Sequence, residues 1–254
     1  MKGAGLDGQV ALVIGGSRGI GRAISLGLAE AGARVVVSSR SRESVDAATG
    51  EIKARGGQAL GVPADVSRLA DVEMLVRETV EQCGRIDVLV NNAGINPLWK
   101  RSETVTPEDW DLIMGVNLRG AFFACRDVGR VMIRQGGGRI VNITSVTALR
   151  GTARGLPYTA AKAGLIAVTQ TLAADWCPHG IRVNAIAPGF VETDMTHGLM
   201  QNSGLYQSLV AKVPMGRFAA PEEMVGLAVY LASEASSYVT GQVFVVDGGY
   251  SAVR

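Results

Sequence analysis

Short, continuous apolar runs alternate with longer amphipathic segments along most of the chain. The apolar runs predict strands over residues 9–14, 35–37, 59–62, 86–90, 140–143, 181–186 and 243–246. Runs of this kind are typical of parallel strands whose two faces are both covered by helices. Between them, apolar residues at helical spacing predict helices over residues 23–29, 43–55, 69–82, 107–134, 158–176 and 221–232.

This alternation predicts an α/β fold. We expect a Rossmann-type, doubly wound, mostly parallel sheet of about seven strands, with right-handed crossovers and helices on both faces. No Pro/Ser-rich linker divides the chain, so residues 1–254 are expected to form one dinucleotide-binding and catalytic domain. Because ligands of such sheets bind outside the carboxyl ends of the strands, motifs far apart in the sequence are expected along one edge.

Residues 190–216 interrupt the alternation with a stretch that lacks a regular pattern and is rich in Met, Leu and Tyr. A long insertion after a strand end is more often a functional lid than a plain connector. We therefore expect a lid over a largely hydrophobic substrate. The alternative is that its apolar residues pack onto a neighbouring helix without contacting ligand.

Composition removes several classes of function. The 254 residues are 47% hydrophobic and 19% charged, with a net charge of only +2, so no basic tract for nucleic acid is present. No apolar run approaches the roughly 20 residues of a membrane span. Three scattered cysteines and two histidines favour reduced thiols over a disulfide framework or a metal site. We expect a soluble, cytoplasmic protein without a metal.

A glycine cluster follows the first predicted strand with the spacing Gly15-x-x-x-Gly19-x-Gly21. Between a strand and a helix, such glycines let the backbone approach a pyrophosphate, which the helix N-terminus then holds. The spacing differs from the usual Gly-x-Gly-x-x-Gly. A tight turn without a ligand is the alternative.

The end of the second predicted strand indicates which dinucleotide binds. Binders of NAD usually place Asp or Glu there for the ribose 2′-OH, whereas this chain has Ser39 and Arg40. Together with Ser17 and Arg18 of the glycine turn, they would offer cations and donors to a 2′-phosphate. The sequence therefore favours NADP(H). NAD(H) remains the alternative, with Arg40 pointing to solvent.

Tyr158 and Lys162 are four residues apart in a predicted helix opened by Pro157, so their side chains share a face. An ammonium beside the phenol is expected to lower the Tyr pKa from about 10 toward neutral pH. A phenol tuned in this way is a general acid or base. An isolated pair at this spacing is more often a solvated helix face, so the other motifs carry the weight of this interpretation.

Taken together, these motifs resemble the short-chain dehydrogenase/reductase family over essentially the full length, and most of all its 3-oxoacyl-[acyl-carrier-protein] reductase branch. The matching elements are the glycine turn, Asp65-Val66, Asn91-Asn92-Ala93-Gly94, Asn117, Ser145, Tyr158-x-x-x-Lys162, Pro188-Gly189 and Asp247-Gly248-Gly249. Each motif alone is weak. Their order, and their placement at predicted strand ends, make the resemblance specific.

The resemblance implies a catalytic set. Ser145 would donate a hydrogen bond to a carbonyl oxygen, Tyr158 would protonate it, and Lys162 would hold the nicotinamide ribose. Asn117 would lie at a helix irregularity and hold a water chain leading to Lys162. Asp65 would bond the adenine amine and Thr193 the carboxamide. The cofactor contacts implied in full are Gly15, Ser17, Arg18, Gly19, Ile20, Gly21, Ser39, Arg40, Asp65, Val66, Asn91, Ala93, Gly94, Tyr158, Lys162, Pro188, Gly189, Val191 and Thr193.

The substrate side is less defined. The residues expected to line it are Ile95, Asn96, Trp99, Thr147, Leu149 and Leu156, with Met195 and Tyr206 from the lid. Neither an acidic or amide cluster nor a basic pocket indicates a substrate class.

Two positions depart from the family pattern. Many relatives have Thr before the first glycine, where its hydroxyl ties the turn to the Asn-Asn-Ala-Gly segment; Ile14 cannot make that bond. Relatives that use an acyl carrier protein tend to have arginines where this chain has Gly136 and His179. This weakens the case for a carrier partner, although Arg139, Arg150 and Arg154 are candidates to replace them.

The predicted function is an NADP(H)-dependent oxidoreductase that interconverts a ketone or 3-oxo group and a secondary alcohol. The alternatives are an NAD(H)-dependent dehydrogenase of a sugar, polyol or steroid-like alcohol and, more remotely, a non-catalytic nucleotide sensor. Enoyl reduction is disfavoured because such relatives carry Lys seven residues after the Tyr, where this chain has Leu165. The family resemblance also implies a homotetramer, built through residues 117–134 and 158–176.

Overall fold

A computed structural model describes residues 5–253, and its centre is a seven-stranded sheet with the strand order β3-β2-β1-β4-β5-β6-β7. All neighbouring strands pair in parallel. The order reverses between β1 and β4, which confirms the doubly wound α/β sheet predicted from the apolar runs. The strands are β1 (Val10–Ile14), β2 (Arg34–Ser38), β3 (Gln58–Gly61), β4 (Val88–Asn91), β5 (Gly138–Ile143), β6 (Ile181–Pro188) and β7 (Val243–Val246).

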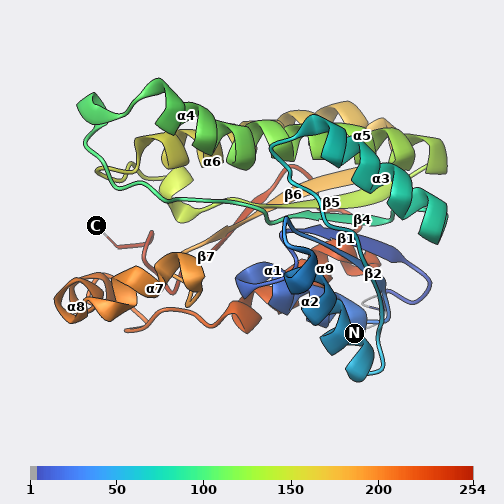
Figure 1. Cartoon of the computed structure of the whole chain (residues 1–254), viewed down its shortest axis with the longest axis horizontal. Helices are drawn as coiled ribbons and strands as arrows, with labels where there is room; N and C mark the ends of the chain where they lie inside the picture. Colours follow the sequence, from blue (N-terminus) through green and yellow to red (C-terminus); the bar gives the residue numbers. More distant parts are fainter. Residues whose placement is uncertain (1–4, 254) are drawn as a thin grey trace.

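Helices cover both faces of the sheet (Figure 1). One face carries α3 (Leu69–Cys83), α4 (Pro107–Met114), α5 (Ala121–Gln135) and α6 (Leu156–Trp176). The other face carries α1 (Gly19–Glu30), α2 (Arg42–Ala54) and α9 (Val225–Ala232), while α7 (Asp194–Gln201) and α8 (Ser203–Val210) lie to one side of these layers. No helix within residues 5–253 has the length and apolarity needed to cross a membrane.

Six short helical segments complete the described chain. A π-helical turn, Gly115–Gly120, joins α4 to α5. The others are 3₁₀ turns at Ser102–Thr104, Val146–Ala148, Cys177–His179, Pro221–Met224 and Glu234–Ser236. The helix predicted over residues 221–232 therefore starts as a 3₁₀ turn before it becomes α9.

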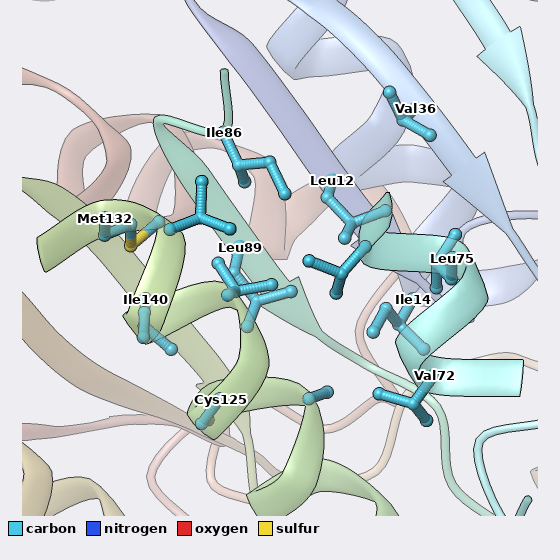
Figure 2. Packing of buried hydrophobic residues seen from close by; sticks show 14 of the residues in the cluster. Leu12, Ile14, Val36, Val72, Leu75, Ile86, Leu89, Cys125, Met132 and Ile140 are labelled. Atoms are coloured by element: carbon cyan, nitrogen blue, oxygen red, sulfur yellow. The ribbon is translucent and has the colours of Figure 1, made fainter. Parts of the chain in front are cut away.

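Two apolar clusters hold the layers together, one on each face of the sheet. Figure 2 shows the first, in which Leu12, Leu89 and Ile140 of the strands pack with Leu75 of α3 and Met132 of α5. The next residues along the same strands, such as Val13 and Val90, enter the second cluster. Because successive strand residues point to opposite faces and both faces are covered, the strands are apolar without interruption. Each fully buried large side chain stabilises the fold by about 1.5–3 kcal/mol.

The segment after β6 differs from the irregular stretch predicted over residues 190–216, because it contains α7 and α8. Thr193 caps α7 in a capping box with Thr196, and the Asn202 side chain accepts a hydrogen bond from the Leu205 amide that begins α8. Neither helix buries a residue completely. Each helix has only 8 residues, which is shorter than the window of about 11–18 residues over which a helical period is recognised in a sequence.

The two ends of this segment are joined to each other. The Ala219 amide donates to the Phe190 carbonyl, and the Glu192 amide donates to the Ala219 carbonyl, each at 2.9 Å. Val191 and Ala219 form an isolated parallel bridge. The segment therefore leaves and rejoins the domain at one point, with α7 and α8 between.

Candidate active site

A cavity of about 710 Å³ lies at the carboxyl ends of the strands, a volume typical of cofactor and small-molecule sites. Its wall brings together segments from the whole chain, from the glycine turn to the start of α7. The predicted positions on the wall are Gly15, Ser17, Arg18, Gly19, Ile20, Ser39, Arg40, Asp65, Val66, Ala93, Gly94, Ile95, Asn96, Ser145, Tyr158, Lys162, Pro188, Gly189, Val191, Thr193 and Met195.

The glycine turn is packed too closely for side chains. Gly15 has a φ of 77°, and a Cβ there would lie 2.6 Å from the Ala93 nitrogen. Gly21 lies beneath the turn and not on the wall; its Cβ would come within 1.9 Å of the Gly15 carbonyl oxygen. The tie that a Thr hydroxyl would supply comes instead from Asn92, whose Nδ2 donates to the Gly15 carbonyl at 2.8 Å. The Ile14 carbonyl also accepts the amides of Asn92 and Ala93.

The N-terminus of α1 faces the cavity with its amides uncommitted to any side chain. Arg18 is the N-cap residue and makes no side-chain cap, and the first turn holds no acidic residue. A Cβ on Gly19 would lie 3.1 Å from Thr193 Cγ2, so backbone there approaches the opposite wall closely. Free amides at the positive end of a helix, flanked by glycines, fit a dinucleotide pyrophosphate.

Cations lie where β2 ends. Arg40 is on the wall close to Asp65, whose Oδ1 accepts hydrogen bonds from the Ser67 amide and hydroxyl. Burial raises the pKa of Asp65, but the Ser67 hydrogen bonds and the charges of Arg40 and Arg68 outweigh it, so the pKa is below its ordinary value. Asp65 is therefore ionised at neutral pH and still borders the cavity.

Ser145 and Tyr158 present their hydroxyls to each other on the cavity wall. Ser145 follows β5 and caps the 3₁₀ turn Val146–Ala148, with its Oγ accepting from the Thr147 amide at 3.2 Å and hydroxyl at 3.0 Å. Tyr158 lies in the first turn of α6, which has Pro157 near its start, and its hydroxyl lies next to the Ser145 side chain. Two hydroxyls thus converge on one point of the cavity.

Lys162 lies one turn further along α6 and is buried. Its Nζ donates to the Ile143 carbonyl at 2.8 Å and lies 5.8 Å from the centroid of the Tyr158 ring. Burial lowers the pKa of Lys162 to about 8. Because 8 is still above neutral pH, the ammonium form prevails there.

The predicted lowering of the Tyr158 pKa is wrong for this arrangement. Burial raises the pKa of Tyr158 to about 12, and the hydrogen bond to Ser145 offsets only part of that effect. The physical reason is that desolvation penalises the phenolate, while the Lys162 ammonium is directed toward the Ile143 carbonyl. The phenol is therefore protonated at neutral pH.

Asn117 lies inside the π-helical turn, where the resemblance implies a helix irregularity. Its Oδ1 accepts the Ile95 amide at 2.9 Å, and its Nδ2 donates to the carbonyls of Ile95 and Ile113. Asn117 is fully buried behind the wall, and a Cβ on Gly94 would lie 2.8 Å from its Oδ1 and 3.4 Å from Lys162 Nζ. Asn117 and Lys162 are thus near neighbours.

Asn91 is not where it was predicted. It is buried away from the cavity, with its Nδ2 donating to Asn142 Oδ1 at 3.0 Å and to the Ala121 carbonyl and Cys125 sulfur. Asn91 is the last residue of β4 and faces α5, whereas Asn92 faces the glycine turn. Asn91 therefore supports the sheet–helix contact, and Asn92 is the residue on the wall.

Five predicted substrate positions also lie off the wall. Trp99 and Leu156 are exposed outside it, as is Leu149, while Thr147 lies behind Ser145. Tyr206 packs edge-on against Phe218, with ring centroids 4.9 Å apart, and so anchors α8. Of the two lid residues expected on the substrate side, Met195 is on the wall and Tyr206 is not.

Several wall residues were not predicted. Asp194 and Thr196 follow Thr193 in the sequence, and that adjacency is the only signal that points to them. Thr144 follows β5 directly before Ser145, so its position at a strand end was a usable signal. Leu112 and Val116 come from α4 and the π-helical turn, which carry no cavity motif.

The positions considered for a carrier partner separate into two regions. Gly136 ends α5, His179 precedes β6 and Arg139 starts β5 paired with Glu234, so all three lie at the sheet edge opposite the cavity. Arg150 folds onto the C-terminal segment, donating to the carbonyls of Tyr250 and Val253.

The chain is similar to known proteins over nearly its whole length. Residues 14–251 match the family model described as Enoyl-(Acyl carrier protein) reductase. The chain is 44% identical to the 3-oxoacyl-[acyl-carrier-protein] reductase of Synechocystis sp., covering 96% of this chain and 97% of the relative. It is 42% identical to the gluconate 5-dehydrogenase of Gluconobacter oxydans, covering 96% and 95%.

Among solved structures, a gluconate 5-dehydrogenase of Burkholderia cenocepacia in complex with NADP and tartrate superposes with a TM-score of 0.95. It is 37% identical and covers 99% of this chain and 98% of that one.

Proposed function

The chain belongs to the short-chain dehydrogenase/reductase family, and we propose that it interconverts a ketone and a secondary alcohol with NADP(H) as the cofactor. One observation carries the proposal: Ser145 and Tyr158 lie next to each other on the wall of the same cavity as the glycine turn. A dinucleotide and a carbonyl compound would therefore meet there.

The wall residues suit NADP(H) at several points. The glycine turn and the α1 N-terminus would hold the pyrophosphate, Arg18 and Arg40 the 2′-phosphate, and Asp65 the adenine amine. When bound, the nicotinamide supplies or accepts the hydride. NADP in the Burkholderia cenocepacia relative supports the assignment. NAD(H) is the alternative.

The proton chemistry follows from the pKa values. A phenol with a pKa of about 12 is protonated at neutral pH, so Tyr158 is ready to give its proton to a substrate oxygen. Ser145 would donate a second hydrogen bond to the same oxygen as negative charge gathers on it. The Lys162 ammonium would stabilise the phenolate left behind. Asn117, bonded to both backbone groups of Ile95, would fix the loop that borders the substrate.

Replacing Tyr158 by Phe tests this assignment. Turnover is expected to fall by a factor of 10² or more, because the general acid is lost, while NADPH binding measured by calorimetry survives. The matched control is Tyr238→Phe, since Tyr238 is fully exposed at 102%. Near-normal turnover of Tyr158→Phe would refute the role.

Two substrate classes fit the cavity. The first is a 3-oxoacyl thioester, supported by the Synechocystis relative and by Arg154, an exposed cation four residues before Tyr158. The second is a sugar acid or polyol. It is supported by the gluconate dehydrogenase relatives and by the lid, whose contribution to the wall is mostly polar, through Thr193, Asp194 and Thr196.

A substrate panel separates the two. A 3-oxoacyl thioester, a keto-gluconate and a steroid-like ketone are each assayed with NADPH and NADH by absorbance of the reduced nicotinamide. Enoyl reduction is disfavoured, because Leu165 occupies the position of the enoyl reductases' Lys and is buried. Cofactor binding without turnover of any carbonyl would favour the sensor alternative.

The assembly and location are also proposals. We infer a cytoplasmic homotetramer built through α5 and α6, as the family resemblance implies. Light scattering after size exclusion measures the mass, and a 26.5 kDa species at micromolar concentration would contradict the tetramer.

A further inference from the structure

An ion pair crosses the cavity mouth between two segments 176 residues apart. Arg18 Nη1 of the glycine turn lies 3.2 Å from Asp194 Oδ2 in the first turn of α7. Both residues are on the cavity wall, and both side chains are largely exposed, at 68% and 72%. The adjacent backbone is also in close contact, since Gly19 faces Thr193. The pair therefore joins the cofactor side of the cavity to the lid.

Arg18 and Arg40, the two cations assigned to the 2′-phosphate, differ in whether a carboxylate is already paired with them. Arg40 has no carboxylate within 4.0 Å among residues 5–253, whereas Arg18 already holds one. Asp194 occupies one of the five N–H donors of Arg18, on Nη1, and places its negative charge beside the guanidinium. A 2′-phosphate that bonds to the Nη1 side of Arg18 therefore competes with the Asp194 carboxylate.

We propose that Asp194 is a specificity-determining residue, which limits the preference for NADP(H) over NAD(H) by competing with the 2′-phosphate for Arg18. This rests on the proposed function, in which Arg18 binds that phosphate. NAD(H) has no 2′-phosphate and leaves the pair intact. Binding of NADP(H) breaks the pair and releases the first turn of α7 from the glycine turn, so the lid responds to one cofactor and not the other.

The size of the effect follows from the exposure of the pair. Exposed ion pairs change an equilibrium constant by about fivefold or less. Removing the Asp194 charge is therefore expected to tighten NADP⁺ binding by about two- to fivefold. The carboxylate also repels any dinucleotide, so the effect specific to Arg18 is the change in the ratio of the NADP⁺ and NAD⁺ dissociation constants.

A double-mutant cycle isolates this coupling. Dissociation constants for NADP⁺ and NAD⁺ are measured by calorimetry, at low and high salt, for wild type, Asp194→Asn, Arg18→Gln and the double variant. Glu192→Gln is the matched control, because Glu192 is an exposed acid two residues away and off the wall. The expected result is a larger NADP⁺ preference in Asp194→Asn, no such gain when Arg18 is already Gln, and no change in Glu192→Gln.

Different results would refute the role of Asp194 and the proposed NADP(H) preference on which it rests. Asp194→Asn with an unchanged or lower NADP⁺ preference overturns the inference, as does an equal gain in the Arg18→Gln background. A wild-type protein that binds NAD⁺ as tightly as NADP⁺ overturns the cofactor proposal itself, and the inference with it. Loss of the coupling at high salt, where exposed pairs are screened, supports the electrostatic origin.

Discussion

Replacing Gly21 by Ala tests how tightly the glycine turn is built. The new Cβ would lie 1.9 Å from the Gly15 carbonyl oxygen and 2.4 Å from Asn92 Nδ2, whereas ordinary contacts begin at 3.4 Å. The turn would have to retreat by about 1.5 Å, and it would lose the 2.8 Å bond between Asn92 and Gly15. Overpacking costs about 1–3 kcal/mol and the hydrogen bond about 1 kcal/mol, so a loss of about 2–4 kcal/mol is expected.

Cofactor affinity is expected to fall with stability, because the displaced turn carries the amides that face the pyrophosphate. Urea unfolding and NADP⁺ calorimetry measure the two effects separately. Gly50→Ala is the control: Gly50 lies in α2 with nothing within 4 Å of its Cβ position, and alanine there favours the helix by up to about 1 kcal/mol. A Gly21→Ala variant within about 0.5 kcal/mol of wild type, with normal NADP⁺ binding, would refute the packing argument.

Three further predictions concern buried and lid residues. Between about pH 8 and 10.5 the Lys162 amine is protonated in the unfolded chain but not in the folded protein, so the free energy of unfolding rises with pH across that window. Lys162→Met should therefore flatten the rise of the free energy of unfolding with pH, measured by urea unfolding. An unchanged slope would contradict the burial of the amine. Asn142→Ala removes two buried hydrogen bonds, from Asn91 and to Thr169, and should cost about 1–3 kcal/mol with NADP⁺ affinity unchanged; a loss of affinity would place this network in the site. Tyr206→Ala should speed proteolysis within α7 and α8 relative to Tyr238→Ala, whereas equal cleavage rates would show that Tyr206 does not anchor the lid.

The fold was predictable because its information is local and repeated. Each strand is an uninterrupted apolar run, since both faces of the sheet are covered, and a glycine or polar turn separates it from the next helix. The lid was not predictable by the same means. Its two helices have only 8 residues each, too few for a helical period to stand out, and caps such as Thr193 and Asn202 are weak signals alone.

The sequence predicted which residues form the site better than it predicted the direction of their side chains or their pKa values. Motif order and strand ends gathered Ser145, Tyr158 and Lys162 correctly on the wall. The choice between Asn91 and Asn92 depends on which face the last strand residue presents, and a one-residue shift reverses that choice. The direction of the Tyr158 pKa depends on the depth of burial, which spacing along a helix does not reveal.

The strand order has a consequence for how the chain is made. β1 lies between β2 and β4, and Ala11 of β1 pairs with Val88 of β4, so the chain up to Asn91 supplies four adjacent strands that end at β4. Each later strand then pairs with the one made just before it: β5 with β4, β6 with β5, and β7 with β6. From β4 onward, the order of translation is therefore the order of neighbours in the sheet. Arg40 and Asp65, proposed above to bind the adenosine end of NADP(H), are translated before Tyr158.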